Sequence, residues 1–111
     1  MSTQITRPAS SRPDRTVADR LAARLRDIPG VADLHPGRYG EVALLYPRHR
    51  VVGLRHTPEV LEVHLVVDLS DLPAARPLAE IAADVRGVVK QEHTDAPPQE
   101  IVLADATGGT P

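Results

Sequence analysis

Histidine is the residue type in this sequence best suited to catalysis or metal binding. The chain has five histidines, which are His35, His49, His56, His64 and His93. No two of them lie four residues apart in a segment with helical periodicity, and no HExxH pattern is present, so the spacing that brings two imidazoles to one zinc ion is missing. Two of the five fall in a predicted hairpin whose register places them on opposite sheet faces. We therefore expect solvated or hydrogen-bonded histidines and no metal site.

Nucleophiles are also scarce. The chain has no cysteine, which excludes disulfides, thiolate metal sites and cysteine catalysis. Ser70 lies in the segment Asp68-Leu69-Ser70-Asp71, which is typical of the approach to a helix and does not have the G-x-S-x-G pattern of a serine nucleophile. Asp68 and Asp71 are a carboxylate pair suited to a cation or to proton transfer, although a solvated loop is the simpler interpretation. The sequence thus predicts no catalytic residue and no cofactor.

One glycine motif invites comparison with nucleic-acid binding. Gly37-Arg38-Tyr39-Gly40 matches the G-x-x-G loop that clamps a nucleic-acid backbone in the KH domain. In that domain the loop joins two helices, whereas here it follows a turn and leads into a predicted strand. We interpret the two glycines as residues that permit a tight turn.

Charge is divided unevenly along the chain. Residues 1–56 carry ten arginines and five acids, a balance of +5, and residues 57–111 carry three basic residues and ten acids, a balance of −7. This asymmetry suits an anionic partner for the first half, or head-to-tail self-association. Arg20, Arg24 and Arg26 form a candidate basic face that leaves a nucleic-acid-binding module as the alternative function. The lack of an aromatic stacking platform and the pI of about 6.2 argue against that alternative.

Length and composition define the organisation of the chain. The 111 residues suit one domain, and the absence of Phe and Trp requires an aliphatic core. We expect residues 1–15 to be a disordered basic tail, residues 16–106 a single domain and residues 107–111 a flexible tail. No apolar run approaches the roughly 20 residues of a membrane span, and the N-terminus does not resemble a signal peptide. A cytoplasmic location without direct membrane insertion is the expectation.

Hydrophobic periodicity predicts two amphipathic helices. The first begins at Thr16, where Thr16 and Asp19 have the spacing of a capping box, and ends at Pro29-Gly30. The second follows Pro77 and carries apolar residues at helical spacing from Leu78 to Val89. Short strands are predicted at residues 31–34, 41–46 and 101–104.

A β-hairpin is the best defined unit in the sequence. Residues 51–56 and 61–69 form its arms, and alternate apolar residues from Leu61 to Leu69 are typical of a half-buried strand. The predicted register pairs His56 with Leu61, Leu54 with Val63 and Val52 with Leu65. The same register places Arg55 opposite Glu62, which are opposite charges on the solvent side.

Together these elements predict an α+β fold. A mostly antiparallel sheet of three to five strands would carry both helices on one face, in the order helix, strands, helix, strand. The other sheet face would then be uncovered, with Arg55, Glu62, His64 and Val66 on it. These four residues are the candidate protein-contact surface.

The chain resembles the alkaline-shock, or envelope stress response, protein family, especially its small actinobacterial branch. The stretches that carry the resemblance are IPGVADLHPGRYGEVALLYP, RVVGLRHTPEVLEVHLVV and RPLAEIAADVRGVVK. The resemblance spans roughly residues 16 to 105 and rests on patterns of turns and hydrophobic residues. It implies a non-enzymatic cytoplasmic protein that acts through protein contacts, with homo-oligomers or a membrane-anchored partner, and it carries over no catalytic residue. We therefore expect an interaction or assembly protein and no enzyme.

Overall fold

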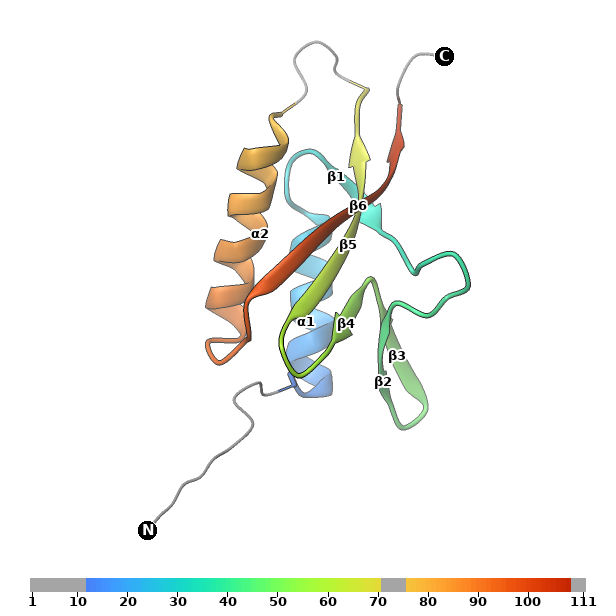
Figure 1. Ribbon diagram of the computed structural model, residues 1–111, viewed down its shortest axis with the longest axis vertical. Helices are drawn as coiled ribbons and strands as arrows, with labels where there is room; N and C mark the ends of the chain where they lie inside the picture. The colour runs from blue at the N-terminus through green and yellow to red at the C-terminus, as the bar shows by residue number, and fades with distance from the viewer. Residues whose placement is uncertain (1–11, 71–75, 109–111) are drawn as a thin grey trace.

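The computed structural model describes residues 12–70 and 76–108 (Figure 1). That part of the chain forms two helices and six strands. In chain order they are α1 (Arg15–Arg26), β1 (Val31–Leu34), β2 (Ala43–Tyr46), β3 (His49–Val52), β4 (Leu54–His56), β5 (Leu61–Asp68), α2 (Leu78–Glu92) and β6 (Gln99–Thr107). The predicted α+β class and the order helix, strands, helix, strand are confirmed.

β5 is the centre of the main sheet. On one edge it pairs antiparallel with β4 through residues 61–63 and with β1 through residues 65–67. On its other edge it pairs with β6 in parallel along its whole length. β2 and β3 form a separate two-stranded hairpin beside α1 (Figure 1). The sheet is therefore mostly antiparallel, as predicted, with one parallel pair.

The core lies between the helices and one face of the sheet. Every second residue of β5 is buried, from Leu61 to Val67, which confirms the predicted alternation. One continuous cluster joins Leu61, Val63 and Leu65 to the buried residues of the helices, which are Ala18, Leu21, Ala22, Leu25, Ile81, Val85 and Val89. Both helices therefore cover the same sheet face, and the residues between the buried positions of β5 point away from them.

The start of α1 differs from the prediction. The N-cap is Asp14, whose carboxylate accepts a hydrogen bond of 2.9 Å from the backbone N–H of Val17. The predicted capping box of Thr16 and Asp19 is therefore wrong, because an aspartate two residues earlier already satisfies the first turn. Pro13 is fully buried, and its carbonyl accepts a 2.6 Å hydrogen bond from the Tyr46 hydroxyl.

The domain consequently begins earlier than residue 16. Residues 12–15 belong to the packed structure, and β6 runs to Thr107. The remaining residues of the two predicted tails, 1–11 and 109–111, lie outside the described part of the chain, as does Asp71.

The predicted hairpin is confirmed near its turn and wrong further from it. Leu54 pairs with Val63, Arg55 with Glu62 and His56 with Leu61, as expected. The predicted pair of Val52 with Leu65 is wrong, because Val52 pairs with Ala43 and Leu65 with Leu34.

Gly53 is the cause of this break. Its φ of +91° lies in the region that favours glycine, and a Cβ atom there would lie 2.3 Å from the Leu34 Cβ. The chain turns at Gly53, so that residues before it join the β2–β3 hairpin and residues after it join the main sheet.

The last strand is longer than predicted. Residues 101–104 were expected to form it, whereas β6 spans Gln99–Thr107. A register shift lies opposite the step from Leu65 to Val66, where Leu65 pairs with Leu103 and Val66 with Asp105. Ala104 is therefore the extra residue of a bulge. The bulge shifts the register by one residue, and β6 stays paired with β5 on both sides of it.

Candidate functional site

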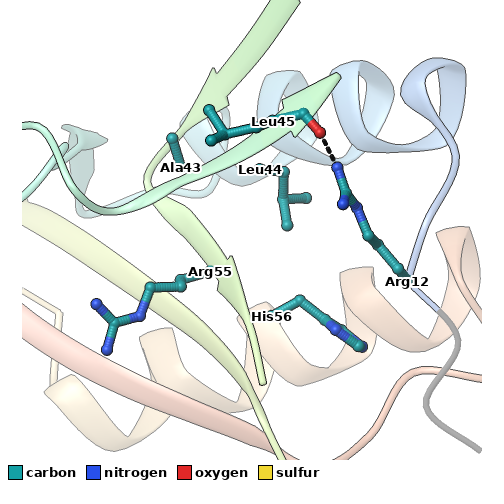
Figure 2. Close-up of a pocket in the computed structure, with 6 residues that line it drawn as sticks. All are labelled: Arg12, Ala43, Leu44, Leu45, Arg55 and His56. Carbon is teal, nitrogen blue, oxygen red and sulfur yellow. Dashed lines mark hydrogen bonds between the residues drawn. The ribbon is translucent and has the colours of Figure 1, made fainter. Parts of the chain in front are cut away.

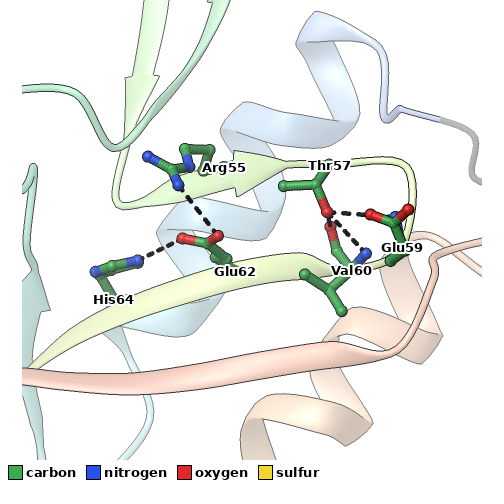
Figure 3. A network of polar contacts seen from close by, with 6 residues as sticks. All are labelled: Arg55, Thr57, Glu59, Val60, Glu62 and His64. Carbon is green, nitrogen blue, oxygen red and sulfur yellow. Dashed lines mark hydrogen bonds and ion pairs between the residues drawn. The ribbon is translucent and has the colours of Figure 1, made fainter.

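The four residues predicted to form a protein-contact surface lie on one face of the sheet. Glu62 and His64 belong to β5 and alternate with its buried residues, and Arg55 lies opposite Glu62 on β4. The Glu62 carboxylate joins them: its Oε1 lies 2.9 Å from His64 Nε2 and its Oε2 lies 3.4 Å from Arg55 Nη2 (Figure 3). Val66, the fourth residue, is half-buried one alternation further along β5. The structure therefore brings the four residues together on one face of the sheet.

This contact face was predicted to be uncovered, whereas in the structure it is partly shielded from solvent. The side chain of Glu62 is 13% exposed and that of His64 is 15% exposed, whereas Arg55 is 45% exposed. An arginine and a glutamate that lie opposite each other on adjacent strands stabilise the sheet by roughly 0.2–1 kcal/mol. The network is therefore a fixed polar feature with one accessible cationic end, and not a row of solvated side chains.

The β4–β5 turn holds that network in register. The Thr57 hydroxyl oxygen accepts hydrogen bonds from the backbone N–H groups of Glu59 (3.3 Å) and Val60 (3.0 Å), and the hydroxyl lies 3.2 Å from the Val60 carbonyl (Figure 3). The backbone N–H of Thr57 also donates to the same carbonyl at 2.9 Å. A threonine that closes the turn in this way fixes how Arg55 meets Glu62.

A second carboxylate lies close to the contact face. The pKa of Glu41 lies below its ordinary value, because backbone N–H groups of Glu41 itself and of Tyr39 bond to the carboxylate, and because Arg55 and His64 favour its charged form. Gly37 lies in the loop between β1 and β2 and allows a tight turn there with its φ of +86°. A Cβ on Gly37 would lie 2.6 Å from the Glu41 carboxylate carbon. The glycines of the G-x-x-G motif therefore serve the turn, as predicted.

β6 extends the contact face to an open strand edge. The parallel register places Val102 beside His64 and Asp105 beside Val66. The second half of β6 is exposed, and Leu103 keeps 45% of its surface accessible to solvent. No strand among residues 12–70 and 76–108 pairs with the far side of β6, which we call the outer edge of β6. Sequence reasoning missed this edge because it ended the strand at residue 104.

The hydrogen bonds between β5 and β6 show which backbone groups reach the outer edge. The Leu61 N–H donates to the Pro98 carbonyl at 2.9 Å. Alternate residues of a strand bond to the same neighbour, so residues 100 and 102 also face β5. The N–H and C=O groups of Ile101 and Leu103 therefore point to the outer edge.

The candidate basic face of α1 is engaged in ion pairs. Arg20 Nε lies 2.5 Å and Arg24 Nη1 lies 2.8 Å from the two carboxylate oxygens of Glu92 at the end of α2. Arg26 Nε lies 2.9 Å from Asp33 Oδ1. These arginines tie α1 to α2 and to β1, which reduces the positive charge that they present to a phosphate backbone.

The carboxyl groups in these pairs respond to the arginines. The pKa of Glu92 is lowered because the side chains of Arg20 and Arg24 bond to its charged form. The pKa of Asp33 is lowered by the side chain of Arg26 and by the backbone N–H of Leu34. Both carboxylates are therefore charged throughout the neutral range.

The remaining candidates for chemistry have local structural roles. His35 Nδ1 accepts a hydrogen bond from the Gly37 N–H at 2.9 Å, and His49 Nε2 lies 2.7 Å from Asp19 Oδ1. Ser70 donates to Asp68 through its hydroxyl and its backbone N–H, and these bonds lower the pKa of Asp68. Within the described residues, no three His, Asp or Glu side chains lie together as a metal site would require.

A cavity of about 230 Å³ lies between the β2–β3 hairpin, β4 and Arg12, which is three residues before α1 (Figure 2). Its lining consists of Arg12, Ala43, Leu44, Leu45, Arg55 and His56. Arg12 donates a hydrogen bond to the Leu45 carbonyl and stacks 4.5 Å from the centre of the Tyr46 ring. Among the described residues, the lining has one histidine, His56, and no hydroxyl or carboxyl side chain.

Comparisons with known proteins give no relative. No protein-family model, no curated protein and no solved structure matches the chain. Among the described residues, neither helix has the length and apolar character needed to cross a membrane.

Proposed function

We propose that the protein is a non-enzymatic interaction or assembly protein that binds other proteins through the outer edge of β6 and the contact face beside it. The observation that carries this proposal is that no strand in the described part of the chain pairs with the outer edge of β6, a nine-residue strand. Free N–H and C=O groups in a row are a template for strand addition from another chain. Leu103 supplies an exposed apolar side chain at the middle of that edge, on the helix side of the sheet beside Leu65.

The edge lacks most of the features by which proteins block strand addition. No lysine or proline lies between Gln99 and Thr107, and the strand is long. The bulge at Ala104 and the acidic residues Glu100 and Asp105 are its protective features. Glu62 and His64 lie on the neighbouring strand β5, and Arg55 lies beyond them on β4, where its exposed guanidinium would give a partner a charged group to recognise.

The resemblance to envelope stress response proteins suggests the setting of this contact. On that resemblance, the protein is cytoplasmic and binds either a second copy or a partner associated with the cell envelope, including a membrane-anchored one. The pattern of residues alone supports this part of the proposal, since no relative was found.

Nucleic-acid binding through the basic half of the chain is the alternative. The geometry favours it less, because Arg20, Arg24 and Arg26 already neutralise Glu92 and Asp33. It predicts binding that weakens steeply as salt increases.

A matched pair of variants tests the proposal. Leu103→Lys places a charge on the outer edge of β6, and Leu78→Lys places the same charge on α2, where the native leucine has nearly the same exposure (47% against 45%). The tagged wild type and both variants would be expressed in an actinobacterial host, and the co-purifying proteins would be identified from membrane and soluble fractions after nuclease treatment. Circular dichroism checks that each variant is folded.

We expect one specific protein, or a second copy of the chain, to be recovered with the wild type and with L78K but not with L103K. Equal recovery with L103K would contradict the assignment of the edge. Recovery of nucleic acid alone, with salt-dependent binding that L103K leaves intact, would favour the alternative.

A further inference from the structure

The last two turns of α2 and the loop that leads to β6 line a second cavity, of about 280 Å³, which is open to solvent on one side. Its lining consists of Arg86, Lys90, His93, Thr94, Ala96 and Gln99. No lining residue is acidic, although the second half of the chain carries ten acids. This cavity is separate from the contact face and from the basic face of α1.

Its two cationic side chains have no partner among the described residues. Arg86 and Lys90 lie four residues apart on α2, so they leave the helix on the same side and repel each other. Neither forms an ion pair or a hydrogen bond within that part of the chain, whereas Arg20, Arg24, Arg26, Arg55 and Arg76 all pair with carboxylates. The nearby carboxylate of Glu92 is already held by two arginines of α1.

The helix dipole explains only one of these cations. A positive charge in the last turn, such as Lys90, is stabilised by the helix C-terminus. Arg86 lies further back, beyond the last turn over which that effect extends. Two adjacent like charges over one hollow therefore leave an excess of positive charge that an anion would neutralise.

Neutral hydrogen-bonding groups line the same cavity. The Gln99 side-chain nitrogen donates a 2.7 Å hydrogen bond to the Pro97 carbonyl, which fixes the orientation of its amide and leaves one N–H for a ligand. Thr94 adds a hydroxyl that rotates to donate or accept. A guanidinium fork, an ammonium group, an amide and a hydroxyl are together the donors that bind an oxyanion with several oxygens.

We propose that this cavity binds a phosphate monoester group or inorganic phosphate. A phosphate monoester carries about −1.5 to −2 charges at neutral pH and so balances both cations, whereas a single carboxylate balances one. The volume lies slightly below the range of roughly 300–1,000 Å³ that is typical for drug-sized ligands, and it is ample for a phosphate group. The site is independent of the protein contact proposed for β6.

The phosphate group has two candidate sources, which are a small soluble phosphate and the headgroup of phosphatidic acid. Two-dimensional amide NMR of the full chain, titrated with inorganic phosphate at constant low ionic strength, tests the first source. Sedimentation with phosphatidic acid vesicles, against phosphatidylcholine vesicles, tests the second. Arg86→Gln and Lys90→Gln each remove one cation from the site, and Arg38→Gln removes an exposed cation from a distant loop.

We expect saturable shifts confined to residues 86–99, with binding that is weaker by about tenfold or more in R86Q and K90Q and unchanged in R38Q. Vesicle binding lost in R86Q and K90Q, without a response to inorganic phosphate, would support the site and identify a lipid source. Absence of both responses, or responses that R86Q and K90Q leave unchanged, would overturn the proposal.

Discussion

Replacement of Gly53 by alanine is the perturbation that tests the fold most sharply. Its φ of +91° is unfavourable for an L-residue, at a cost of about 1–2 kcal/mol. The added Cβ would also lie 2.3 Å from the Cβ of Leu34, an atom close to the backbone that cannot swing aside. Such overpacking costs typically about 1–3 kcal/mol, so the free energy of unfolding should fall by about 2–5 kcal/mol.

Gly87→Ala is the matched control. Gly87 lies within α2, and an added Cβ there meets no atom within 4 Å. This variant should gain about 0.5–1 kcal/mol, because alanine is the better helix former. The same chemical change therefore has opposite effects on stability at the two positions.

Urea denaturation followed by circular dichroism measures both variants. The midpoint should fall in G53A and rise in G87A, with similar slopes. A G53A protein within about 0.5 kcal/mol of wild type would refute the conclusion that Gly53 breaks the hairpin strand.

Three further changes test how the elements are held together, each by urea denaturation. Leu65→Ala removes a fully buried side chain from β5 and should cost about 2–5 kcal/mol; a loss below this range would mean that the core is not centred there. Asp14→Ala removes the N-cap of α1 and should cost about 1 kcal/mol; an unchanged stability would point to another cap. Glu92→Gln weakens the link to Arg20 and Arg24 and should destabilise the protein at neutral pH. The lowered pKa of Glu92 means that its contribution is present above the ordinary value of 4.5 and is lost as the pH falls through the folded-state pKa. The gap between wild type and E92Q should therefore narrow in acid, and a constant gap would contradict the ion pair.

Local patterns in the sequence predicted the parts of the fold that depend on neighbouring residues. The buried alternation of β5, the three pairs of β4 with β5 and the start of α2 after Pro77 all follow from periodicity and turn chemistry. The Arg55–Glu62 pair was predictable because both residues belong to one hairpin.

Features that depend on distant residues could not be predicted in this way. Gly53 breaks the strand because of its approach to Leu34, which lies on β1. The outer edge of β6 depends on a parallel pairing that no local pattern encodes. The charge of Arg20, Arg24 and Glu92 was visible in the sequence, but their pairing required the two helices to be placed side by side.

The same distinction between local and distant residues applies to the two candidate sites. The four residues of the contact face lie together because strand alternation places them there. The phosphate-binding cavity was missed because Arg86, Lys90 and Gln99 meet only when α2 and β6 are brought together. Arg86 and Lys90 at helical spacing were the one sequence signal that could have indicated it.

Hydrogen exchange at the outer edge of β6 tests the central claim most directly. The backbone amides of Ile101 and Leu103 should exchange quickly in the dilute protein, because they point away from β5 and have no strand partner among the described residues. Addition of the co-purified partner, or an increase in protein concentration if the partner is a second copy, should slow the exchange of these two amides. Amides of Ile101 and Leu103 that stay fast under both conditions would contradict strand addition at β6 and the interaction function built on it.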